Sequence, residues 1–269
     1  MNARPLIGAT AMVYGFDMAE NLRQLSAHVR HAELLLYWTP AENNFPAAAK
    51  VAELKALAGD LNLSLSVHLP PMLDLITGSA AERQRHLDLL CNLIQTLQPL
   101  NPTGYVLHLG PHTPTLTANP VKYLPADGHC DLAFWYDRGL AALSALQSAT
   151  GLGPRLLIEN LDFSPLLLRP FLEAGLAGLC FDAGHVWLGR ENLATVFAPL
   201  WAYVQEIHLH GVKGNMEHLS LSELSCENRR EFTDLLLQWN YTKLVNLEVF
   251  TPDDLKTSLL YLQPFLHIE

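Results

Sequence analysis

The sequence alternates short apolar runs with amphipathic stretches from one end to the other, and this alternation constrains the fold more than any other feature. Most of the runs are apolar at consecutive positions, which is typical of parallel strands that are covered on both faces. The eight strand candidates are 6–11 (LIGATA), 32–37 (AELLLY), 63–69 (LSLSVHL), 104–110 (GYVLHLG), 155–160 (RLLIEN), 179–184 (LCFDAG), 204–210 (VQEIHLH) and 244–250 (LVNLEVF).

The segments between these runs have the patterns of helices. Ser79 with Glu82 and Ser220 with Glu223 have the spacing of capping boxes, and Pro252 fits a first helical position. Eight βα units without a break in composition predict an α/β fold, a single (β/α)8 TIM-barrel domain over residues 1–269. The connection 110–131 is long and rich in Pro and Thr, which favours a functional loop.

Composition excludes several classes of protein. The net charge is −10 and Lys and Arg form no run, so we expect no nucleic-acid partner and no membrane surface. No apolar run reaches the roughly 18 residues of a membrane helix. The apolar stretch at the N-terminus is too short and too weakly charged for a convincing signal peptide. The four cysteines show no CxxC spacing. We therefore expect a cytoplasmic protein.

Polar side chains gather at the carboxyl ends of the last six strand candidates, where a barrel carries its chemistry. These ends supply, in order, His68, His108, Glu159, Asp182 with His185, His208 with His210, and Glu248, and a loop after strand seven adds Glu217 and His218. Buried carboxylates are costly unless they are paired or bound to metal. Imidazole and carboxylate donors together suit Zn²⁺, Mn²⁺ or Fe²⁺. Because the donors outnumber those that one ion uses, we predict two or three divalent ions, and Zn²⁺ is the metal that we expect before Mn²⁺ or Fe²⁺.

Single residues of this set also have simpler interpretations. Asp182 could cap the turn at Gly184, and Glu159 could be a hydrogen-bonded buried acid. His208 and His210 are two apart on a strand and so share a face, which favours both pointing into the barrel. His210 could instead face the outer helices.

The ordered set resembles the xylose isomerase-like barrels, and especially their endonuclease IV branch. That resemblance implies three metal positions: one held by His68, His108 and Glu159, a second by Glu159, Asp182, His208 and Glu248, and a third by His185 and His218. The endonucleases supply the third ion with Asp-x-His, whereas here Met216 stands at the first of those positions. Glu217 or His210 are the candidates to complete that site.

A closer resemblance is to the cobamide remodelling phosphodiesterases. It rests on IENL and FDAGH in strands five and six, IHLHGV followed by EHLSL, and LEVF near the C-terminus. It implies metal-dependent hydrolysis of the nucleotide-loop phosphodiester of a corrinoid to release cobinamide, with Glu159, Asp182 and Glu248 as catalytic carboxylates. We expect aromatic residues to wall a corrinoid site; the candidates are Tyr14, Phe16, Trp38, Tyr123 and Trp187.

Three alternatives remain. A sugar isomerase or epimerase of the same fold would need one divalent ion, which Glu159, Asp182, His208 and Glu248 could hold, and it would leave His68, His108 and His218 without a use. A DNA-repair nuclease of the endonuclease IV type would need basic DNA-binding loops that the sequence lacks. A corrinoid-binding protein without catalysis would bind the same ligand and turn nothing over.

Overall fold

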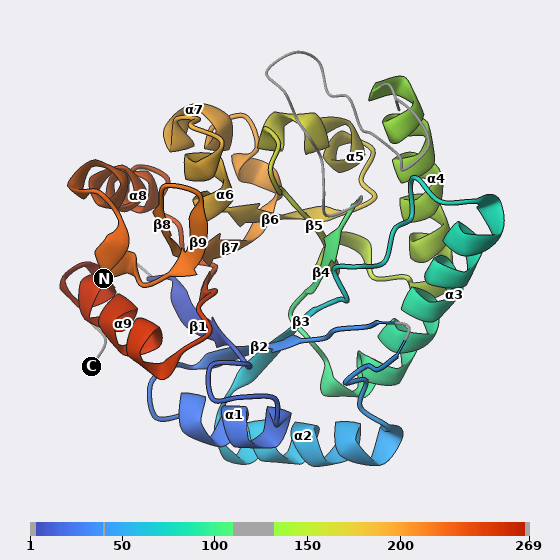
Figure 1. Ribbon diagram of the computed structural model, residues 1–269, viewed down its shortest axis with the longest axis horizontal. Helices are drawn as coiled ribbons and strands as arrows, with labels where there is room; N and C mark the ends of the chain where they lie inside the picture. Colours follow the sequence, from blue (N-terminus) through green and yellow to red (C-terminus); the bar gives the residue numbers. More distant parts are fainter. Residues whose placement is uncertain (1–3, 40, 110–131, 267–269) are drawn as a thin grey trace.

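Eight parallel strands close into a barrel in the computed structural model, which describes residues 4–39, 41–109 and 132–266 (Figure 1). Their order around the barrel is β1-β10-β7-β6-β5-β4-β3-β2. The strands are β1 (Leu6–Thr10), β2 (His31–Leu35), β3 (Ser64–His68), β4 (Tyr105–His108), β5 (Leu156–Glu159), β6 (Gly178–Asp182), β7 (Val204–Leu209) and β10 (Leu244–Leu247). Each lies within or overlaps one of the eight predicted runs, so the predicted (β/α)8 barrel is confirmed.

Helices form the outer layer around the barrel (Figure 1). They are α1 (Met18–Leu25), α2 (Ala48–Asp60), α3 (Ala80–Leu97), α4 (Leu132–Thr150), α5 (Arg169–Glu173), α6 (Ala183–Leu188), α7 (Leu193–Phe197), α8 (Cys226–Gln238) and α9 (Pro252–Leu266). In the described part of the chain, none of them has the length and apolar character that a membrane crossing requires. The predicted loop 110–131 lies outside the described residues.

The helix starts test two predictions about capping. Ser79 caps α3 and forms the predicted reciprocal box with Glu82. The box predicted for Ser220 and Glu223 is wrong, because the Ser220 hydroxyl accepts from the Ser222 N–H and only a short 3-10 turn follows. Helix α8 begins later, where Ser225 is its N-cap.

A two-stranded hairpin that the sequence did not reveal follows β7. Its antiparallel strands are β8 (Gly211–Lys213) and β9 (Met216–Leu219). It replaces the simple loop expected between β7 and α8, and it holds His218 beside the end of β10, where His218 Nδ1 donates to the Glu248 carbonyl at 3.2 Å.

The barrel interior is apolar on one side and polar on the other. Val106, Leu157 and Cys180 form a small apolar cluster of their own. They precede His108, Glu159 and Asp182 by two residues and therefore face the same way. Across the barrel the interior is polar and completely or almost completely buried, with His31, Glu33, Ser66, Glu206, His208 and Asn246. The barrel interior below the candidate site is thus apolar on one side and polar on the other.

Candidate metal centre

The predicted site residues converge at the carboxyl ends of the strands. His68, His108, Glu159 and Asp182 are the last residues of β3, β4, β5 and β6, His208 is the next to last of β7, and Glu248 directly follows β10. In-register parallel pairing sets His108 beside Glu159 and Asp182 beside His208. The sheet itself, rather than flexible loops, therefore fixes the centre of the site.

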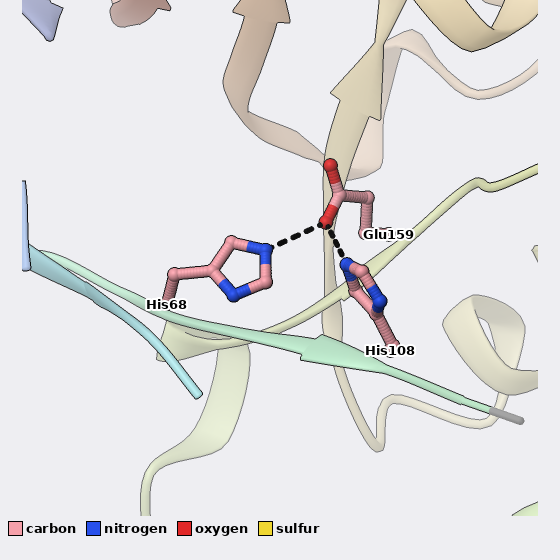
Figure 2. A group of neighbouring side chains, drawn as sticks. All are labelled: His68, His108 and Glu159. Carbon is pink, nitrogen blue, oxygen red and sulfur yellow. Dashed lines mark hydrogen bonds and ion pairs between the residues drawn. The ribbon is translucent and has the colours of Figure 1, made fainter. Parts of the chain in front are cut away.

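His68, His108 and Glu159 form the first group, and Figure 2 shows both imidazoles directed at one carboxylate oxygen. His108 Nε2 lies 2.8 Å and His68 Nε2 3.3 Å from Glu159 Oε2. The other nitrogen of His68 donates to the Leu69 carbonyl at 2.9 Å. That backbone bond fixes the ring, so Nε2 is the atom offered to the site.

Glu159 also belongs to a second group through its other oxygen. Its Oε1 lies 2.7 Å from His208 Nδ1, and Glu248 Oε2 lies 3.4 Å from the same nitrogen. Together with Asp182 these residues place one ligand atom each within 4.8 Å of one another. One carboxylate therefore links two donor groups.

Asp182, His185 and His210 form a third group near the mouth of the barrel. Asp182 caps α6, since its Oδ1 accepts from the His185 N–H at 2.7 Å. The simple interpretation of Asp182 is therefore correct for one oxygen only. Its Oδ2, together with His185 Nδ1 and His210 Nε2, is buried and has no hydrogen-bond partner in the described part of the chain.

Acidic side chains, and not Met216, lie next to His185 in this third group. Met216 is 56% exposed on β9. Two acids approach His185 Nδ1 instead, Asp162 Oδ1 at 3.3 Å and Glu217 Oε2 at 3.9 Å. His218 joins His210 and Glu248 in a neighbouring group. His210 and Glu217 were the two candidates to complete this site. His210 is fully buried, 3.4 Å from Asp182, and Glu217 is more exposed and lies 3.9 Å from His185.

The electrostatics of the site fit divalent ions. Burial alone would lower the pKa of His68, but the hydrogen bond with Glu159 raises it to about 9. The pKa of His185 is likewise lowered by burial and raised more strongly by Asp182, to about 10. Burial raises the pKa of Glu159, yet the nearby His208, His108 and His68 hold it well below its usual range. The Glu159 carboxylate is thus favoured in its ionised form and attracts positive charge, which metal ions would supply.

A cavity of about 240 Å³ opens above these groups. Its described apolar lining residues are Leu35, Pro71, Leu161 and Phe250. None of the predicted aromatic walls lies among its described lining residues. Tyr14 lines a separate groove against α9, Phe16 is 74% exposed, Trp38 packs on His86, and Trp187 donates to Glu231 in a hollow beside α8; Tyr123 lies outside the described residues.

Two buried acids below the site escaped the sequence interpretation. Glu33 on β2 is fully buried, and Glu206 on β7 is 2% exposed. Both sit in runs that were interpreted only as apolar strands. The available signal was their period: Glu206 stands two residues before His208 and so shares its face.

The comparisons with known proteins agree with this architecture. Residues 14–265 match the family described as "Xylose isomerase-like TIM barrel". No curated protein matches the sequence. A D-psicose 3-epimerase structure from Clostridium cellulolyticum has a TM-score of 0.74 at 13% identity, covering 98% of this chain and 99% of its own. Endonuclease IV from Thermus thermophilus has a TM-score of 0.71 at 16% identity, covering 98% of this chain and 100% of its own. Sequence identities this low show a shared fold and leave the reaction open.

Proposed function

Because the chain belongs to the xylose isomerase-like TIM-barrel family, we propose that it is a metal-dependent phosphodiesterase, and that its substrate is the nucleotide loop of a cobamide. The observation that carries the proposal is the group of His68, His108 and Glu159 beside the four-residue group that shares Glu159. Linked donor sets of this kind suit two adjacent ions, the arrangement typical of phosphate-ester hydrolysis.

Each donor has a distinct part in this proposal. His68, His108 and Glu159 would hold one ion, and Glu159, Asp182, His208 and Glu248 would hold a second. His185, His210 and His218 are the candidates for a third, nearer the solvent. Bound divalent ions would make water nucleophilic near neutral pH and offset the charge that develops on the phosphate. The protein's own part is to keep these donors fixed on strand ends, so that little reorganisation accompanies the reaction.

The cavity bears on how a corrinoid would bind. A volume of about 240 Å³ accommodates a phosphodiester and one adjoining ring, whereas a corrin macrocycle is far larger. The macrocycle would therefore rest on the rim, and Phe250, 36% exposed beside the cavity, is a candidate contact. The choice of a corrinoid rests on the resemblance of the strings IHLHGV, EHLSL and LEVF to the cobamide remodelling enzymes.

The decisive experiment is to incubate purified protein of known metal content with several cobamides and to follow cobinamide by chromatography. We expect product from at least one cobamide and its loss in His68→Ala. His28→Ala is the matched control, because His28 lines the groove beside α9, away from the cavity. No product across the panel with metal bound would refute the proposed substrate, and an abasic-site duplex assayed in parallel would reveal a DNA nuclease.

A sugar epimerase is the second candidate, and two observations favour it. Glu159, Asp182, His208 and Glu248 alone could hold a single ion. Several of the similar solved structures are sugar epimerases, including a D-tagatose 3-epimerase-like protein with a TM-score of 0.75 at 18% identity, covering 98% of this chain and 97% of its own. In that reaction Glu159 and Glu248 would exchange protons with a carbon centre. One tightly bound ion per chain, with epimerisation of a ketose, would establish it over the phosphodiesterase.

A further inference from the structure

Glu33 makes a contact across the barrel that neither proposed reaction explains. It lies on β2, and its Oε2 is 3.3 Å from His208 Nε2 on β7. These strands are separated by β1 and β10 in the barrel order, so the contact spans the interior and does not arise from strand pairing. Both side chains are fully buried. A carboxylate placed there without a charged or polar partner would be strongly unfavourable.

The two nitrogens of His208 face different surroundings. Nδ1 points at Glu159 Oε1 at 2.7 Å and at Glu248 Oε2 at 3.4 Å, which are candidate metal ligands. Nε2 points away from them, toward Glu33. A histidine that binds a metal through one nitrogen keeps its proton on the other, and the acceptor of that proton sets the tautomer. Here the acceptor is Glu33.

Other side chains hold the Glu33 carboxylate in place. Asn246 Nδ2 donates to Glu33 Oε1 at 2.9 Å, and the Ser66 hydroxyl oxygen lies 3.5 Å from Oε2. The Asn246 amide therefore holds one oxygen of the carboxylate, and the other oxygen faces the imidazole. Fixed in this way, it presents a defined acceptor rather than a mobile charge.

We propose that Glu33 is a positioning residue of the metal centre, which keeps the His208 proton on Nε2 and so leaves the Nδ1 lone pair free for the ion. The inference rests on the metal centre of the proposed function and is independent of the substrate. It holds equally for a phosphodiesterase and for an epimerase, since His208 belongs to the donor group that both would use.

Glu206 provides a matched control. It is another buried interior acid, 2% exposed, and its Oε1 also lies near the Ser66 hydroxyl oxygen, at 3.4 Å. Its Oε1 lies 3.7 Å from His208 Nε2 and makes no hydrogen bond with it in the described structure. Neutralising Glu206 thus removes a similar buried charge and leaves the hydrogen bond between His208 Nε2 and Glu33 in place.

The test measures Zn²⁺ affinity of metal-free protein by competition with a chromophoric chelator, without any substrate. Loss of such an outer carboxylate typically weakens metal binding about 10–100-fold. We expect that loss for Glu33→Gln and a change of less than about threefold for Glu206→Gln. Wild-type affinity in Glu33→Gln, or an equal loss in both variants, would overturn the inference.

A second measurement keeps the inference testable if Glu33→Gln fails to fold. Nitrogen-15 NMR of the wild-type protein with Zn²⁺ bound reports the tautomer of each histidine, and His208→Asn identifies the His208 signals by their absence. We expect a proton on Nε2 and zinc on Nδ1, and the reverse assignment would overturn the inference. Because only zinc is used, a protein that cleaves no cobamide can still confirm the role of Glu33.

Discussion

Gly184 is the residue whose substitution tests most directly whether His210 is seated in the site. A Cβ built at Gly184 would lie 2.6 Å from His210 Nδ1 and closer still to two other ring atoms. Contact between such atoms is comfortable at about 3.5–4.0 Å, so the ring would have to retreat by about 1 Å or more. His210 is fully buried, and its Nδ1 accepts from the His218 N–H at 3.0 Å. There is little room for that retreat.

The magnitude for Gly184→Ala follows from opposing effects. Alanine in place of glycine favours a helix by up to about 1 kcal/mol, whereas overpacking a buried ring typically costs about 1–3 kcal/mol. Loss of the His218 hydrogen bond adds about 1 kcal/mol. We expect a net destabilisation of about 1–3 kcal/mol, measured as a lower midpoint of urea unfolding with an unchanged m-value.

Gly189→Ala is the matched control at the other end of α6. A Cβ there would meet backbone oxygens at 3.4 and 3.5 Å, and the residue has a φ of −68°, which alanine adopts freely. We expect its midpoint to equal that of the wild type or to exceed it slightly. If Gly184→Ala were as stable as Gly189→Ala, the position of His210 against α6 would be incorrect.

Three further predictions concern other parts of the molecule. Burial lowers the pKa of His31 to about 4 from an ordinary 6.5, so the unfolded chain binds the proton more readily than the folded one. The free energy of unfolding should therefore be highest above pH 6.5 and should fall by up to about 3 kcal/mol as the pH is lowered to 4. His31→Gln should weaken this pH dependence of the urea midpoint. Ser79→Ala removes the cap and the capping box of α3 and should cost about 1 kcal/mol by urea unfolding. Glu159→Gln should lower the metal content per chain more than His68→Ala does, because Glu159 belongs to two donor groups; equal losses by elemental analysis would contradict its shared role.

The strand ends could be predicted because two simple rules act on them together. Parallel strands bring their carboxyl ends to one edge, and a barrel closes that edge into a ring. His68, His108, Glu159 and Asp182 needed no further information to be brought together. His210 was less certain from the sequence, since it is the single residue between β7 and β8 and its direction depends on how the hairpin leaves the barrel strand.

The walls of the cavity could not be predicted for a physical reason. Trp38 lies in a loop and Trp187 on α6, and whether either ring faces the site depends on its packing partner. Those partners, His86 and Glu231, lie far away in sequence. Glu33 was missed for the same reason, because its partner His208 is 175 residues away. Contacts across the barrel leave no local pattern beyond an acid in an apolar run.

The histidines at the ends of β3 and β4 distinguish the two candidate reactions, whereas the four-residue group at the centre of the site does not. Glu159, Asp182, His208 and Glu248 would serve a single ion in an epimerase as well as one of two ions in a phosphodiesterase. His68 and His108 add two imidazoles aimed at the free side of Glu159, at 3.3 and 2.8 Å. A single-ion enzyme has no need for them, and burying two imidazoles beside a carboxylate carries a desolvation cost. Their presence is therefore the strongest argument in this chain for a second ion, and through it for phosphate chemistry.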